Sequence, residues 1–129
     1  MKEIDNTVRI LYFSDEYKEF YEKLDIISQS KVDKIINYIR TTKQLTSNHT
    51  KKIQGPSNTN DIYEIIVTST NRREYRILSV CFFNGGIIDN INLSDEMLLL
   101  NGFLKKSNKD YTPAMKKANR IVDGFLSDE

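Results

Sequence analysis

The chain has 129 residues, of which 39% are apolar and 29% charged, and its formal net charge is +1. This length and composition are typical of one globular domain spanning residues 1–129 and exclude an intrinsically disordered chain. No apolar run approaches the roughly 20 residues of a membrane-spanning helix, and the acidic N-terminal segment lacks the pattern of a secretory signal, so we expect a cytoplasmic protein.

The first half of the chain predicts a strand followed by two helices. Residues 8–13 are rich in β-branched and aromatic side chains at alternating positions, which indicates a strand. Ser14 is a typical N-cap for the first helix, since two acids follow it. Apolar side chains at helical spacing predict a second helix near 29–42, and the two helices are expected to form an N-terminal helical hairpin. The polar stretch 43–61 is predicted to be mostly loop.

The second half predicts three strands and a closing helix. Two β-rich segments, 62–70 and 73–83, are close enough to form a hairpin across Asn71 and Arg72. A long connection at 84–96, a strand at 97–103 and a helix from about Pro113 to Phe125 follow, with the proline in the first helical turn. The predicted class is α+β, with a small antiparallel sheet against which the helical hairpin and the C-terminal helix pack.

Cys81 and His49 are the only residues of their types in the chain. A single cysteine forms no internal disulfide, and its apolar surroundings predict a buried, unreactive thiol. Neither residue has partners at ligand spacing, so we expect no metal site and no cofactor.

The charges are unevenly distributed despite the small net charge. Residues 1–30 hold four bases and seven acids, whereas residues 101–120 hold six bases and one acid. This segregation predicts one basic face that a polyanion would meet, although ordinary solvated helix charges give a similar pattern.

Several short strings, in order along the chain, carry a resemblance to a known family. They are Lys51-Lys52-Ile53-Gln54-Gly55, Ile62-Tyr63-Glu64-Ile65, Tyr75-Arg76-Ile77-Leu78, the run from Leu99 to Lys106, and Thr112-Pro113 with Ala118 and Arg120. Together, from Val8 to about Arg120, this set resembles the phage-related Gp49/HigB branch of the RelE/ParE toxin superfamily.

The resemblance implies a RelE-like fold and a toxin of a type II toxin–antitoxin system that cuts mRNA in the ribosomal A site. In that reaction the ribose 2′-OH attacks the adjacent phosphate, without a metal. The chemistry needs a proton acceptor, cations for the phosphate and a proton donor for the leaving oxygen. The implied partners are the ribosome with its mRNA and a helix-turn-helix antitoxin in a hetero-oligomer, and no membrane is involved.

Four residues are candidates for the catalytic set. Arg76 is either a salt-bridged residue or a bidentate phosphate clamp, and the resemblance favours the clamp. Lys105 and Lys106 follow the last predicted strand, where they either project into a cleft or form a solvated pair. Tyr111 is a candidate proton donor, with packing at the helix start as the alternative.

Four further residues are candidates for contacts with RNA. Lys51 and Lys52 resemble the basic residues that precede the sheet in the family, and Lys109 is a further candidate phosphate contact. Phe103 is a candidate for stacking on an mRNA base, although a core position is the favoured alternative.

The chain also departs from the family's pattern. Asn101 stands where the family often has histidine, Asp110 places a negative charge where RNA would approach, and the 84–96 segment adds three acids. These departures put catalytic competence in question. A second hypothesis is therefore a non-catalytic interaction module, which either poisons gyrase or only binds its antitoxin.

Overall fold

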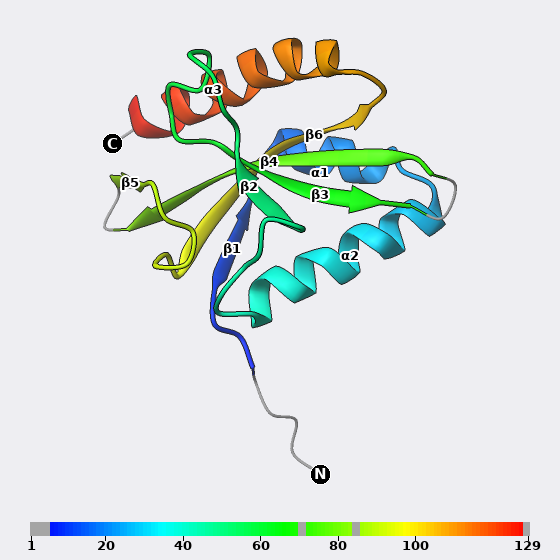
Figure 1. The fold of residues 1–129 in the computed structure, drawn as a ribbon, viewed down its shortest axis with the longest axis horizontal. Helices are drawn as coiled ribbons and strands as arrows, with labels where there is room; N and C mark the ends of the chain where they lie inside the picture. Colours follow the sequence, from blue (N-terminus) through cyan, green and yellow to red (C-terminus); the bar gives the residue numbers. More distant parts are fainter. Residues whose placement is uncertain (1–5, 70–71, 84–85, 128–129) are drawn as a thin grey trace.

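The computed structural model describes residues 6–69, 72–83 and 86–127. Its elements in chain order are β1 (Ile10–Phe13), α1 (Asp15–Glu22), α2 (Ile26–Thr41), β2 (Thr50–Lys52), β3 (Tyr63–Thr68), β4 (Glu74–Phe83), β5 (Gly86–Ile88), β6 (Glu96–Lys105), the 3-10 helix η1 (Asn108–Asp110) and α3 (Tyr111–Ser127). Figure 1 shows α3 on one side of the sheet and α2 on the other. The predicted α+β class and the C-terminal helix are confirmed.

The strands form one six-stranded mixed sheet. The strand order is β1-β6-β4-β3-β2, and β5 pairs with β4. β1 runs parallel to β6, whereas the other pairs are antiparallel. The predicted small antiparallel sheet is therefore wrong in its size and in one strand direction. Short turns predict only which consecutive strands pair, and β1 and β6 are separated by most of the chain.

Polar side chains start both N-terminal helices. The Ser14 side chain accepts a hydrogen bond from the backbone N–H of Tyr17, which confirms the predicted cap of α1. Asp25 accepts from the N–H of Ser28 and starts α2 at Ile26, earlier than predicted. The hairpin packing of the two helices is not confirmed, because α1 lies mainly against β6 and α2 against β3. No helix within the described ranges is long and apolar enough to cross a bilayer.

The central strands follow the sequence-based prediction, and the short outer strands do not. β3 and β4 pair antiparallel as predicted; of the predicted turn, Asn71 lies outside the described residues and Arg72 has a positive φ of 61°. The segments 43–61 and 84–96, predicted as connections, contain β2 and β5. Strands of three residues are too short to show a periodic pattern.

Two apolar clusters cover the two faces of the sheet. On one face, β4 and β6 residues pack against buried residues of α3, namely Ala114, Met115, Ala118 and Val122. On the other face, the sheet packs against α1 and α2 through a cluster that includes Tyr17, Val32 and Ile39. The face toward α3 also carries the polar residues described below.

Gly102 allows α1 to pack closely on β6. A Cβ atom at this position would lie 2.5 Å from the Cδ2 and Cε2 atoms of the Phe20 ring. We expect Gly102→Ala to lower the free energy of unfolding by about 1–3 kcal/mol, since the ring has to move. Gly124→Ala is the matched control: no atom lies near its new Cβ, and alanine in a helix is expected to add about 0.5–1 kcal/mol. Urea unfolding measures both, and equal stability of the two variants would contradict this account.

Candidate active site

The face of the sheet toward α3 brings together charged residues from three strands. Leu78 belongs to the core cluster under α3, and Glu64 is its partner on β3. Arg76, two residues before Leu78, lies on the same face beside Glu64. Lys51 is directly opposite Glu64 on β2. Across the sheet, the acidic Glu64 on β3 thus lies between the basic Lys51 on β2 and the basic Arg76 on β4.

Glu64 and Arg76 form a buried ion pair, in which each side chain is only 6% exposed. The Arg76 Nε atom lies 3.3 Å from Oε1 of Glu64, without the geometry of a hydrogen bond. Nη2 donates to Glu74 at 3.0 Å, and Nη1 to the carbonyl of Tyr75 at 3.1 Å. Burial lowers the pKa of Arg76, but contacts with Glu74 and Tyr111 outweigh it and raise the pKa above its ordinary value. Arg76 is therefore salt-bridged on an interior strand.

Tyr111, the first residue of α3, reaches this ion pair. Its hydroxyl donates to Oε1 of Glu64 at 3.0 Å, and its ring contacts Phe103 edge-on at 5.3 Å between centroids. The Lys105 ammonium lies 5.6 Å from the centre of the same ring. Burial and the charge of Glu64 raise the pKa of Tyr111. The hydroxyl therefore keeps its proton, which it shares in the hydrogen bond to Glu64.

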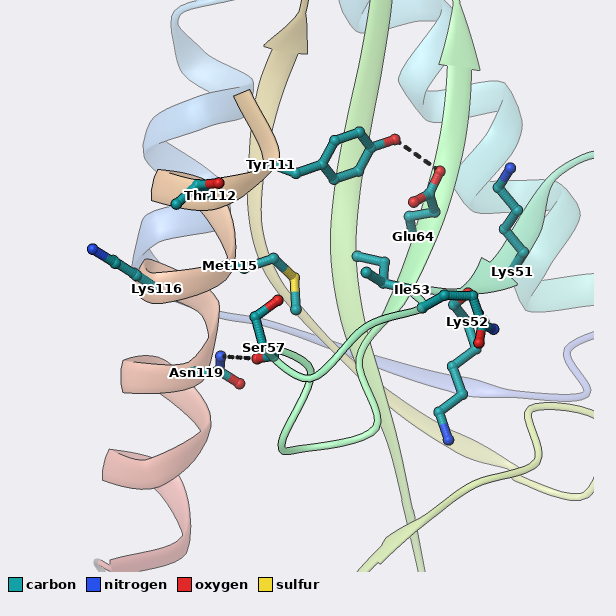
Figure 2. A pocket seen from close by; sticks show the side chains of 11 residues that line it. Lys51, Lys52, Ile53, Ser57, Glu64, Tyr111, Thr112, Met115, Lys116 and Asn119 are labelled. Carbon is teal, nitrogen blue, oxygen red and sulfur yellow. Dashed lines mark hydrogen bonds between the residues drawn. The ribbon is translucent and has the colours of Figure 1, made fainter. Parts of the chain in front are cut away.

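Beside Glu64 and Tyr111 is a cavity of about 540 Å³, within the range of small-molecule pockets. Figure 2 shows Tyr111 and Glu64 pointing toward each other, with the loop after β2 and the first turns of α3 around them. The loop is tied to α3, because Asn119 donates to the Ser57 carbonyl at 3.0 Å and Asn60 donates to Asn119 at 2.9 Å. The lining residues are Lys51, Lys52, Ile53, Gln54, Ser57, Glu64, Tyr111, Thr112, Met115, Lys116 and Asn119.

The two lysines of β2 differ in their surroundings. Figure 2 shows their ammonium groups pointing in opposite directions. Lys52 forms ion pairs with Asp89 at 2.6 Å and Asp61 at 3.0 Å, and hydrogen bonds to these acids raise its pKa to about 12. Lys51 is exposed beside Glu64. Of the two, Lys51 is the better placed for an anion in the cavity.

Of the other basic residues near the site, some lie at the cavity or at Tyr111 and others lie outside it. Lys105 is the last residue of β6, a strand longer than predicted, and sits by Tyr111. Lys106 and Lys109 are exposed on the turn that follows and do not line the cavity. Lys116, on the second turn of α3, does line it, although no site role was predicted for it.

The chain matches a known protein family over most of its length. Residues 19–123 match the sequence model of the family described as phage-derived protein Gp49-like (DUF891). The chain belongs to this family. Gp49-like proteins are part of the RelE/ParE-like toxin superfamily, which relates the chain to toxins of toxin–antitoxin systems. No curated protein and no solved structure matches the chain.

Two departures from the expected Gp49-like pattern occupy structural positions. Asn101 is buried, and its Nδ2 donates to the carbonyl of Ala114 at 3.2 Å, which joins β6 to α3. Its Oδ1 has no hydrogen-bond partner among the described residues. Asp110 accepts from the backbone N–H groups of Ser107 at 2.8 Å and Lys106 at 2.6 Å. The Asp110 carboxylate thus stabilises the turn between β6 and α3 through these two hydrogen bonds.

The hydrogen bonds to Asp110 make the stability of this turn pH-dependent. They hold the pKa of Asp110 below its ordinary value. A carboxylate whose pKa is lowered by folding stabilises the fold above its unfolded-state pKa, and this contribution is lost as the pH falls through the folded-state pKa. We expect Asp110→Asn to lower the urea midpoint at pH 7, and the gap from the wild type to narrow as the pH falls below the ordinary pKa of an aspartate. A gap that is the same at every pH would contradict this role.

Glu64 had no predicted role, although it lies in one of the strings that carry the family resemblance. Glu64 is one acid in an otherwise apolar strand segment, Ile62-Tyr63-Glu64-Ile65. An acid at a buried strand position is a signal for a functional or ion-paired site. Among the described residues, no group of three or more His, Cys, Asp and Glu side chains is placed to hold a metal ion.

Proposed function

We propose that residues 1–129 form a toxin domain that cleaves mRNA on the ribosome, by attack of a ribose 2′-OH on the adjacent phosphate. The observation that carries the proposal is the hydrogen bond between Tyr111 and the buried Glu64 carboxylate, beside a cavity with lysines at its wall. Family membership supports the toxin class. A carboxylate and a phenol are a base and an acid of the kind that this reaction needs.

Glu64 and Tyr111 can exchange protons during such a reaction. The Oε1 atom of Glu64 accepts from Tyr111, which leaves Oε2 to accept the proton of the attacking 2′-OH. As the new P–O bond forms and the P–O5′ bond breaks, Tyr111 donates its proton to the leaving oxygen and takes another from Glu64. The products are a 2′,3′-cyclic phosphate and a 5′-hydroxyl, and both side chains return to their starting states.

Cationic side chains would stabilise the charge that gathers on the phosphate. Lys51 lies opposite Glu64 and Lys105 lies by the Tyr111 ring, so these two are the cations nearest the pair. Lys116 lines the cavity, but Figure 2 shows its ammonium group pointing away from the pair. In this scheme Arg76 orients the Glu64 carboxylate through their ion pair. Direct contact of Arg76 with the phosphate remains a prediction.

RNA outside the cavity would meet the remaining basic candidates. We propose that Lys106 and Lys109 contribute contacts near the start of α3. A contact of RNA with Lys52 remains a prediction, since its ammonium group is held by Asp61 and Asp89. Phe103 buttresses Tyr111, and its stacking on a base remains a prediction. The partners in this proposal are the ribosome with its mRNA in the cytoplasm and a helix-turn-helix antitoxin.

The test is translation of a defined mRNA with purified protein, with and without ribosomes, read by primer extension. We expect ribosome-dependent cuts, and a loss of about 10²-fold or more in cleavage rate for Tyr111→Phe, which removes the proposed proton donor. Tyr12→Phe is the matched control, since Tyr12 also donates to a glutamate, Glu96 at 2.9 Å, but on β1. Intact mRNA from folded wild-type protein would reject the ribonuclease and favour a module that poisons gyrase or only binds its antitoxin.

A further inference from the structure

The edge of the sheet at β1 exposes apolar side chains. β1 is the last strand in the sheet order, and Val8, Ile10, Tyr12 and Phe13 in and beside it are exposed, with Ile10 at 52%. Proteins usually protect such an edge with lysine, proline or a covering segment. Residues 8–13 contain neither lysine nor proline, and the end of α2 covers only the start of this segment, where the Arg40 carbonyl accepts from the N–H groups of Val8 and Arg9. This edge is therefore suited to pairing with a further strand.

The register of β1 leaves main-chain groups available for that pairing. The N–H of Ile10 donates to the carbonyl of Asp95, and the N–H of Ser14 to that of Leu99. Alternate residues of a parallel strand direct their amide groups to opposite edges. Leu11 and Phe13 therefore direct their N–H and C=O groups away from β6, where none of the described residues bonds to them.

Acidic groups surround this edge and indicate the charge of its partner. Glu96 lies beside β1 on one face, where it accepts the Tyr12 hydroxyl. On the other face Asp33 and Arg40 line a groove of about 240 Å³ together with Leu11 and Phe13, and the Arg40 side chain donates to Asn37. Two acids, Asp15 and Glu16, fill the first turn of α1 directly after the strand, so acids outnumber bases among these residues. A second copy of the chain would bring the same acids to the seam, whereas a basic partner would complement them.

We propose that the β1 edge binds an extended segment of a different protein as an added strand, apolar at alternating positions and flanked by lysine or arginine. The main-chain N–H and C=O groups of Leu11 and Phe13 would hydrogen-bond to the added strand, and the exposed apolar side chains of β1 would make the binding specific. This surface is independent of the proposed ribonuclease site, because β1 and β2 are at opposite ends of the sheet order.

The probe is a fluorescent synthetic peptide, KKVTVIVTKK, titrated with the full-length protein and followed by anisotropy. We expect saturable binding that weakens between about 50 and 500 mM salt, and binding at least about tenfold weaker for the charge-reversed peptide EEVTVIVTEE. Hydrogen exchange at the amides of Leu11 and Phe13 should slow when the basic peptide binds.

Ile10→Lys is expected to weaken binding of the basic peptide by about tenfold or more, since it places a base on the edge. Ile26→Lys is the matched control, because Ile26 is 83% exposed at the start of α2, and it should bind as the wild type does. Circular dichroism verifies that both variants fold. The proposal is overturned if the wild type does not bind the basic peptide, or if Ile10→Lys binds it equally well. It is also overturned if the free protein is a dimer that Ile10→Lys dissociates. The last of these would assign the edge to a second copy.

Discussion

Replacing Glu64 with glutamine is expected to reduce ribosome-dependent mRNA cleavage by about two to four orders of magnitude. Glutamine keeps the shape of the side chain and an oxygen that accepts from Tyr111, but it cannot take the proton of the 2′-OH. The substitution also removes one carboxylate from the buried Arg76 pair. Loss of one partner of such a pair costs about 3–5 kcal/mol, so the urea midpoint must be measured together with the cleavage rate.

Two other variants make this experiment decisive. Glu96→Gln removes the carboxylate that accepts from Tyr12. Glu96 is at the opposite end of β6 from Lys105, the residue beside Tyr111, so this variant should cleave mRNA as the wild type does. If Glu64→Gln does not fold, Glu64→Asp keeps the charge and tests the same role through the altered reach of the carboxylate. A folded Glu64→Gln protein with wild-type cleavage would remove Glu64 from the mechanism.

Replacing Arg9 with methionine is expected to lower the free energy of unfolding by at least about 4 kcal/mol, because several buried carbonyls would lose their donor at about 1–3 kcal/mol each. The Arg9 side chain is buried. It donates to the carbonyls of Ile39, Thr42, Lys43, Ile91 and Ser94. One guanidinium thus joins the end of α2 to the loop before β6. The expected loss is a large part of the roughly 5–15 kcal/mol that stabilises a typical domain.

Urea unfolding tests this role of Arg9. Arg40→Met is the matched control, since Arg40 is exposed and its side chain donates to Asn37 on its own helix; a change within about 0.5 kcal/mol is expected for such a surface position. Arg9→Lys should be intermediate, since an ammonium group reaches fewer of the carbonyls. An Arg9→Met protein as stable as the Arg40→Met protein would show that the carbonyls find other partners.

Features set by neighbouring residues could be predicted from the sequence. The cap at Ser14 and the β3–β4 pair depend on short-range patterns, and both are present in the structure. The parallel β1–β6 pair depends on contacts between the two ends of the chain, which no local pattern encodes. Arg9 is the clearest example: on an alternating strand it has the pattern of an ordinary polar position, and only the assembled fold surrounds it with carbonyls.

In the candidate site, too, some residues could be predicted from the sequence and others depend on contacts made only in the fold. Arg76 and Tyr111 were predicted as site residues, and the structure places both within reach of one carboxylate. That carboxylate, Glu64, had no predicted role, because its importance comes from partners on β4 and α3. Lys52 was grouped with Lys51 as its neighbour in sequence, but consecutive strand residues face opposite sides of a sheet, and Lys52 is held by Asp61 and Asp89.

The cavity wall is assembled from segments far apart in the chain, and this has a consequence for synthesis. Asn60 and Ser57 leave the ribosome well before Asn119, which ties their loop to α3. Tyr111 and Lys116 also belong to α3, so a nascent chain that lacks this helix has no Tyr111 hydroxyl beside Glu64 and lacks the α3 side of the cavity wall. The ribosome that makes the protein would therefore not be exposed to a complete site until α3 has emerged and docked.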